Sequence, residues 1–204
     1  LRSHDRPDEG EGGAVGWHFF RVGRMMATQN LVEVLSAHLF ADTGARVYAV
    51  LDGAAIPDLL EKCEEHSVEP VCLYRGDLIP ALAKVAPYQV TLERDSPFAR
   101  WLLREGWGRH WGIFAVSRAG WRPMREHLCG LIMVYDPDYQ PLYFRYYDPR
   151  VLRVYLPTCD AEELQALFGP ISRLLCEDGE GGLLKCWVAG GQLGSERVAL
   201  EPAK

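Results

Sequence analysis

VYAVLDG, at residues 47–53, is the stretch on which the fold of this chain depends. It opens with an unbroken apolar run rich in β-forming residue types, and Asp52-Gly53 ends that run with turn-forming residues. A strand that is apolar on both faces has to be covered on both faces. The stretch therefore predicts a central strand that is buried on both sides.

The sequence before this strand predicts a tail and one helix. Apolar residues recur at helical spacing across residues 28–41, and Gly44 is placed to stop the helix soon after. His38 lies on the same apolar stripe, where a lone histidine is more often a packed residue than a ligand. Residues 1–27 mix charge with glycine and show no sustained period, so they are predicted to form a flexible tail.

Helices and strands alternate after the central strand. Pro57 can occupy the first turn of a helix, Ser96-Pro97 is an N-cap followed by proline, and Arg122-Pro123 opens a further helix. A β-hairpin follows, with Asp136-Pro137-Asp138 supplying its turn. The order predicts an α/β (α+β) fold, a mixed β-sheet flanked by helices. The other strands of that sheet are predicted at residues 71–75, 87–92 and 111–117.

Residues 144–170 read FRYYDPRVLRVYLPTCDAEELQALFGP, which leads from a strand into two helices. Asp148 is predicted to cap the first of these helices, because its carboxylate can accept the amide hydrogens that the first turn leaves free. Pro149 fits the first helical position, where no amide hydrogen is needed. Either Arg145 or Arg150 is close enough in sequence to pair with Asp148 and hold this corner rigid.

A second helix and a β-hairpin complete the predicted fold. Asp160 with the glutamate three residues on resembles a capping box for the second helix, and Gly169-Pro170 terminates it. Residues 172–188 divide into two apolar runs around a glycine-rich tip, which is typical of a hairpin. We therefore expect a single domain at residues 28–190. Residues 191–204 show no period and are predicted to be a loose C-terminal tail.

The composition argues against several partners. A formal net charge of −6 and a pI near 5.5 do not provide the basic face that nucleic acid requires, so no nucleic-acid partner is expected. No apolar run approaches the roughly 20 residues that cross a bilayer, and the N-terminus lacks the apolar core of a signal peptide. We therefore expect no membrane partner and a cytoplasmic location. The six cysteines are expected to be reduced thiols.

Local motifs for catalysis or for a cofactor are not evident in the sequence. The glycine pairs at 181–182 and 190–191 lack the spacing of a nucleotide-binding loop, and no serine lies in a G-x-S-x-G elbow. The histidines form no H-x-x-x-H or H-x-H pair. We therefore predict no catalytic residue, no metal and no cofactor. A Cys/His nucleophile pair stays open, because such partners meet only in the fold.

Tyrosine and arginine are concentrated in the predicted hairpin and the corner after it. These residue types are enriched at protein interfaces, because they combine a large contact area with hydrogen bonds. The alternative, which the sequence leaves open, is a hairpin whose apolar face is simply rich in tyrosine. The predicted partner-binding residues are Tyr143, Arg145, Tyr147, Arg150 and Arg153.

A series of short motifs extends along residues 46–172. They read VYAVLDGA (47–54), LYRGD (73–77), APYQVTL (86–92), WGIFAVS (111–117), REHLCGLIMV (125–134), LYFRYYDPRVL (142–152) and LFGP (167–170). As an ensemble, this pattern resembles the type VI secretion adaptor family, whose core is described as a domain of unknown function. The positions that match the family's motifs are Leu51, Asp52, Gly53, Ala86, Pro87, His127, Leu128, Arg145, Asp148, Pro149, Arg150, Phe168, Gly169 and Pro170.

Two positions depart from the family's pattern. Leu167 stands in place of the first phenylalanine of a Phe-Phe-Gly-Pro motif, and Cys129 stands in place of the arginine that follows His-Leu.

The resemblance implies a function without catalysis. Members of the family are cytoplasmic chaperones of Gram-negative bacteria that bind a toxic effector, often through its N-terminal region, and load it onto the VgrG spike. The expected partners are therefore a cognate type VI effector and the VgrG spike protein. Two alternatives remain: an immunity protein that buries a toxin's active site, and an enzyme with an unrecognised Cys/His site.

Overall fold

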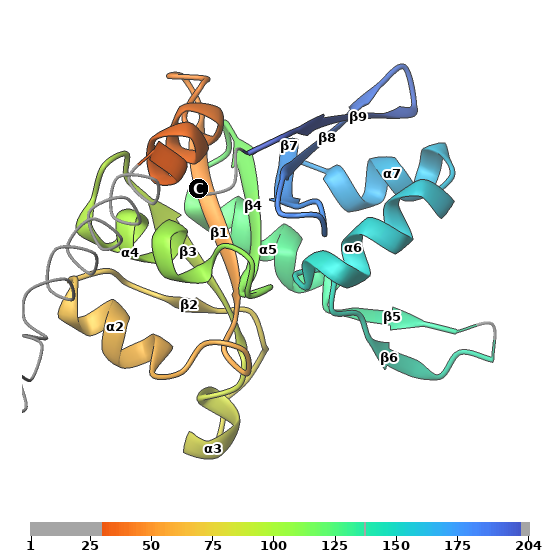
Figure 1. Ribbon diagram of the computed structural model, residues 1–204. Coiled ribbons are helices and arrows are strands. Elements are labelled where there is room, and N and C mark those ends of the chain that lie inside the picture. The colour runs from red at the N-terminus through yellow and green to blue at the C-terminus, as the bar shows by residue number, and fades with distance from the viewer. Residues whose placement is uncertain (1–29, 137, 201–204) are drawn as a thin grey trace, which may run out of the picture.

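The computed structural model of the chain describes residues 30–136 and 138–200, and the tail predicted at residues 1–27 lies outside them. Its main feature is a seven-stranded sheet with the strand order β2-β3-β1-β4-β7-β8-β9, beside a separate two-stranded sheet, β5-β6 (Figure 1). Every strand pair in the described residues is antiparallel, so the sheet that the sequence predicted as mixed is antiparallel throughout, with neighbouring strands running in opposite directions. The predicted α+β class is confirmed.

The elements follow the predicted order closely. The strands are β1 Arg46–Asp52, β2 Val71–Cys72, β3 Pro87–Leu92, β4 Gly112–Ser117, β5 Met133–Tyr135, β6 Pro141–Tyr143, β7 Ile171–Glu177, β8 Leu183–Ala189 and β9 Gln192–Val198. The helices are residues 30–39, α2 Leu59–Glu65, α3 Pro80–Ala83, α4 Pro97–Gly106, α5 Trp121–Leu131, α6 Pro149–Tyr155, the 3-10 turn η1 Leu156–Thr158 and α7 Ala161–Phe168.

Strand β1 is buried on both faces, as its sequence predicts. It pairs with β3 on one side and with β4 on the other. Val47, Ala49 and Leu51 enter one core, while Tyr48 and Val50 enter the other, because successive side chains of a strand point to opposite faces. The apolar run therefore joins two cores through a single strand.

The two faces of the sheet are covered by helices from different parts of the chain. The helix at residues 30–39, α2 and α4 contribute to the first core, through residues such as Leu35, Cys63 and Phe98. Helices α5, α6 and α7 contribute to the second core, through residues such as Leu128 and Leu152. Figure 1 shows these two groups of helices on opposite sides of the sheet. The α5–α7 segment therefore builds one whole layer.

The predicted helix caps are present. Ser96 accepts a hydrogen bond from the Ala99 amide at 3.2 Å, with Pro97 at the first helical position of α4. Asp160 and Glu163 form both hydrogen bonds of a capping box at the start of α7. These bonds satisfy amide hydrogens that a helix start leaves without partners, so the sequence determines where α4 and α7 begin.

The C-terminal prediction was wrong for residues 192–198. They are not part of a loose tail but form β9, which pairs with β8 along its whole length. Gly190 and Gly191, with φ of 59° and 76°, make the two-residue turn between these strands, a conformation that glycine adopts without strain. Strand β9 lacks an apolar period because it lies at the edge of the sheet, with several residues exposed to solvent.

Smaller differences concern the first half of the chain. Helix α2 begins at Leu59, after Asp58 in the left-handed region at φ 56°, rather than at Pro57. The strand predicted at residues 71–75 keeps ladder pairing only at β2, and the connection before β3 contains the short helix α3. Strand β3 is buried except at Thr91: Tyr88, Val90 and Leu92 lie in the first core, and the buried Gln89 donates to the Trp121 carbonyl at 3.2 Å.

Candidate functional site

Four charged side chains meet where β1 ends and α6 begins; we call them the corner. They are Asp52, Arg145, Asp148 and Arg150. Arg145 Nη2 donates to Asp52 Oδ2 at 2.5 Å and lies 3.8 Å from Asp148 Oδ2. Arg150 Nη2 lies 2.7 Å from the same Asp148 oxygen. Both carboxylates are buried, whereas the arginine side chains are 49% and 60% exposed. The corner therefore has buried carboxylates and exposed guanidinium groups.

Asp148 organises the corner from the start of α6. Its Oδ1 accepts the backbone amide of Arg150 at 2.9 Å, which confirms the predicted cap. The Arg150 side chain returns to both carboxylate oxygens, at 3.0 Å from Nε and 2.7 Å from Nη2, so this pair is bidentate. Burial alone would raise the pKa of Asp148, but hydrogen bonds and charge from Arg150 hold it below its usual value.

Asp52 is the corner residue whose role the sequence did not reveal. It lies 93 positions before Arg145, and their pairing depends on the sheet bringing the end of β1 under the chain that enters α6. Its other oxygen accepts the Ala54 amide at 3.0 Å and stabilises the turn after β1. Sequence reasoning placed Asp52 in a turn, and only the fold supplies its arginine.

Tyrosines connect the corner to the β5-β6 hairpin. The Arg145 guanidinium lies 6.0 Å from the centre of the Tyr147 ring, and the Tyr74 and Tyr143 rings are 5.7 Å apart. Burial, together with the neighbouring Tyr74, raises the pKa of the Tyr147 hydroxyl. Tyr147 is only 4% exposed, and its ring packs beneath the Arg145 guanidinium. The sequence predicted it as a partner contact, but its burial leaves little surface for such a contact. Tyr143 is exposed on the hairpin.

The β5-β6 hairpin projects from the body of the molecule (Figure 1). Asp136 Oδ1 accepts the amides of Asp138 and Gln140 at 2.9 and 2.8 Å, which confirms the predicted turn chemistry. Large apolar side chains of the hairpin nevertheless face solvent. They are Met133, Val134, Tyr135, Tyr139, Leu142 and Tyr143, of which Tyr139 is 84% exposed.

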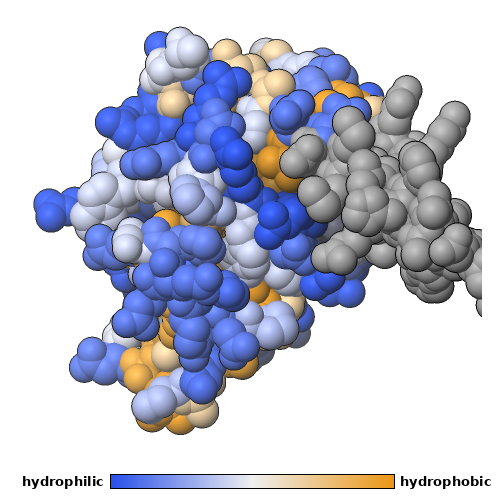
Figure 2. Space-filling model, turned by 60° about the vertical axis from the view of Figure 1, so that its left-hand side comes forward, coloured by the Kyte–Doolittle hydropathy of each residue, from blue (hydrophilic) through white to orange (hydrophobic). Residues whose placement is uncertain are grey.

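A second exposed apolar segment lies beside the other flank of the corner, around α3. Ile79, Leu82 and Val85 are all exposed, and the lowest projection of the molecule in Figure 2 carries hydrophobic residues. The Gly53 amide donates to Ala86 O at 3.0 Å, and a Cβ on Gly53 would lie 2.4 Å from that oxygen. Glycine at 53 therefore lets this segment approach the end of β1. We call α3, the corner and the hairpin together the exposed end.

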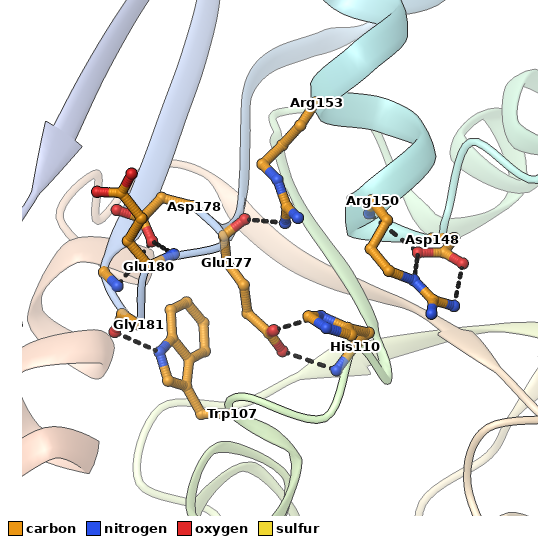
Figure 3. A network of polar contacts seen from close by, with 10 residues as sticks. Trp107, His110, Asp148, Arg150, Arg153, Glu177, Asp178, Glu180 and Gly181 are labelled. Atoms are coloured by element: carbon orange, nitrogen blue, oxygen red, sulfur yellow. Dashed lines mark hydrogen bonds and ion pairs between the residues drawn. The ribbon is translucent and has the colours of Figure 1, made fainter.

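Arg153 belongs to a neighbouring polar network, shown with the corner pair Asp148–Arg150 in Figure 3. Its Nη1 donates to the Glu177 carbonyl at 2.6 Å, which joins α6 to the end of β7. The Glu177 carboxylate receives the His110 amide at 3.0 Å and lies 2.7 Å from His110 Nδ1. Arg153 was predicted to contact a partner. In the structure it is half-buried, and one of its guanidinium donors is used by the hydrogen bond to the backbone of Glu177.

Two further motif positions meet at the joint between α5 and α7. His127 Nε2 lies 2.9 Å from Leu167 O, and burial lowers the pKa of this histidine. Gly169 has φ 48°, and a Cβ there would lie 2.4 Å from the His127 ring. The Pro170 carbonyl accepts the Ser117 hydroxyl at 2.6 Å. Together with buried Pro87, Pro149 and Phe168, these residues hold elements together.

The cysteines do not form a reactive pair with a histidine in the described residues. All six are unpaired, and no hydrogen bond joins a cysteine to a histidine there. Burial raises the pKa of Cys63 and Cys186 to about 11 and that of Cys176 to about 12. A thiol must ionise to act as a nucleophile, so these three are poorly suited to that role at neutral pH. Within residues 30–136 and 138–200, no cluster of three potential metal ligands occurs.

The structure defines an α+β protein whose motif residues form a charged corner and tight joints beside an exposed apolar end. The sequence model of a family described as "Domain of unknown function (DUF4123)" matches residues 47–166, more than half of the chain. The chain belongs to this family. No curated protein and no solved structure matches it. None of the helices among the described residues has the length and apolar character needed to span a bilayer.

Proposed function

We propose that this protein is a type VI secretion adaptor. It binds a cognate toxic effector in the cytoplasm of a Gram-negative bacterium and loads it onto the VgrG spike, without catalysis. Membership of the family and the resemblance of the motifs between residues 46 and 172 to type VI adaptors support the proposal. The exposed end supplies a surface of the kind that such an adaptor needs.

The observation that carries the proposal is the exposure of large apolar side chains on the hairpin. Contiguous apolar patches on a protein surface mark sites of interaction, and tyrosine and arginine dominate the energetics of such sites. Tyr135, Tyr139 and Tyr143 are exposed here, and the half-exposed Arg145 lies two residues after Tyr143. A surface of this composition suits a protein partner.

The hairpin contributes little to the stability of the fold. None of the residues of β5 and β6 belongs to either core. An isolated two-stranded hairpin is at best marginally stable in water, and exposed tyrosines gain little from burial within the chain. A binding role accounts for side chains that the fold itself does not require.

Co-purification tests the proposal. The effector and VgrG encoded beside this protein are expressed with it and without it. We expect soluble effector and an effector–VgrG complex only when the protein is present. The proposal fails if effector solubility and spike association do not depend on the protein. Protection of cells from the toxin without loading onto VgrG would instead identify an immunity protein.

A matched pair of variants locates the binding surface. Tyr135→Ser combined with Tyr139→Ser removes two exposed rings from the hairpin. Trp121→Ser removes an exposed aromatic side chain that lies near Thr91, at the other end of β3 from the corner. We expect the first variant to lose effector and the second to retain it. Equal retention by both would remove the hairpin from the effector-binding surface.

A further inference from the structure

Each corner arginine uses part of its guanidinium group to bind an aspartate of the corner and leaves the rest without a hydrogen-bond partner among the described residues. Arg150 engages Asp148 through Nε and Nη2, and Arg145 engages Asp52 through Nη2. Within the part of the chain that the structure describes, no hydrogen bond involves Nη1 of either guanidinium. Each arginine therefore keeps donors that a partner can use, while its conformation is already fixed.

Burial separates the charges of the corner. The carboxylates of Asp52 and Asp148 are covered, while the guanidinium side chains are about half exposed. A partner approaching from solvent meets the cations first, although the whole chain has a net charge of −6. This local polarity is opposite to that of the protein as a whole.

Nearby exposed charges add to the same polarity. Arg75 follows Tyr74 along the chain, and Lys84 lies in the segment that approaches Gly53; both are exposed. Asp77 is an exposed acid between them, and the hairpin turn carries Asp136, whose carboxylate is engaged by backbone amides. Counted by exposure, the cations Arg75, Lys84, Arg145 and Arg150 outnumber the exposed acids Asp77 and Asp138 of these segments.

We infer that the corner binds a carboxylate from an acidic and apolar segment of the effector, an inference that rests on the proposed function. Both guanidiniums approach Asp148 Oδ2, at 3.8 Å from Arg145 and 2.7 Å from Arg150. The two guanidiniums therefore share one neighbouring carboxylate oxygen, and on this inference one partner carboxylate accepts hydrogen bonds from the remaining donors of both. The exposed side chains of the hairpin and of the α3 segment lie on either side to receive the apolar neighbours of that carboxylate.

The physical gain comes from preorganisation. A long arginine side chain normally loses rotamer freedom when it binds, and here Asp52 and Asp148 have already restricted it. Hydrogen bonds between a guanidinium and a carboxylate are charge-assisted and directional. Specificity for a carboxylate therefore comes from the corner, and contact area comes from the apolar flanks.

Titration calorimetry with the purified effector tests the inference. The dissociation constant is measured at about 50 and about 500 mM NaCl, because exposed charge pairs weaken as salt screens them. We expect Arg150→Gln and Arg145→Gln each to weaken binding about tenfold at low salt and to reduce the salt dependence. Arg122→Gln is the control, since Arg122 stacks on Trp121 away from the corner. Overlapping peptides of the effector then identify the acidic segment.

The outcomes separate the inference from the proposed function. If the effector binds tightly and all three variants bind with wild-type affinity and salt dependence, the adaptor proposal stands and the acidic segment is rejected. If the wild-type protein does not bind the effector, both are rejected. Thermal unfolding of each variant shows whether a weaker affinity reflects a lost contact or a lost fold, and Arg150→Lys, which keeps charge without the bidentate geometry, separates charge from orientation.

Discussion

Residues 133–143 and residues 144–155 are both rich in tyrosine, yet they occupy opposite environments. Tyr146 is 2% exposed, and its hydroxyl donates to Leu128 O at 2.9 Å. Tyr139 is 84% exposed at the hairpin tip. The buried tyrosine lies against a helix that offers a carbonyl and an apolar surface, whereas the hairpin has no such neighbour. Position relative to α5, and not residue type, decides which tyrosines are structural.

The same contrast separates the motif residues from the exposed residues. Asp148, His127 and Gly169 each make contacts that join two elements or begin a helix. Most of the exposed large apolar side chains lie instead on the hairpin and on the segment around α3. The motif residues with buried side chains therefore describe the scaffold, whereas the exposed motif residues Arg145 and Arg150 belong to the proposed binding surface.

The largest difference between the two regions should appear in stability. Tyr146→Ala removes a buried ring and its hydrogen bond, and we expect the free energy of unfolding to fall by about 3–5 kcal/mol. Tyr139→Ala, the matched change on the hairpin, should alter it by less than about 0.5 kcal/mol. Urea unfolding of both variants measures the contrast. Equal losses would show that the hairpin is part of the cooperative fold.

A glycine substitution tests the α5–α7 joint. Gly169→Ala places a Cβ against His127 at a residue with φ 48°, so we expect a loss of about 1–3 kcal/mol. Gly130→Ala is the control, because a Cβ at this exposed helical position meets nothing within 4 Å apart from the adjacent residues and the backbone of its own helix. Alanine there should leave stability unchanged or slightly higher. If both variants unfold at the wild-type midpoint, the joint does not constrain the fold.

The smallest expected effect concerns the charge of Asp148. Its pKa is lowered in the folded protein, so the stability it contributes is present above the ordinary value of 3.8 and is lost as the pH falls towards the folded value. Asp148→Asn keeps a capping side chain and removes the charge. We expect it to cost about 1 kcal/mol at neutral pH, with the difference shrinking below pH 3.8. A pH-independent difference would contradict this assignment.

Much of the fold could be predicted because its signals are local. Ser96, Asp148 and Asp160 cap helices through amides no more than three residues away. The unbroken apolar run of β1 likewise predicts that this strand is buried on both faces. Strand β9 was missed even though Gly190-Gly191 is a hairpin signal, because an edge strand need not be apolar. Strand pairing direction has no local signal of this kind.

The candidate site was predictable only in part. The sequence identified Tyr143, Arg145 and Arg150 as surface candidates, and the structure leaves all three exposed. It could not distinguish them from Tyr147 and Arg153, whose environments depend on the distant Tyr74 and Glu177. Nor could it pair Asp52, which it identified only as a turn and motif position, with Arg145, because this contact is set by the fold that brings the two residues together.

The pairing of β4 with β7 has a consequence for what can be expressed as a fragment. The family match ends at residue 166, whereas β7 begins at Ile171 and pairs with β4 along Phe114–Ser117. A recombinant piece trimmed to residues 47–166 would expose the edge of β4 as an unprotected aggregation surface, and would remove Leu174 and Cys186 from the second core. The segment that the family model matches therefore leaves out three strands of the seven-stranded sheet.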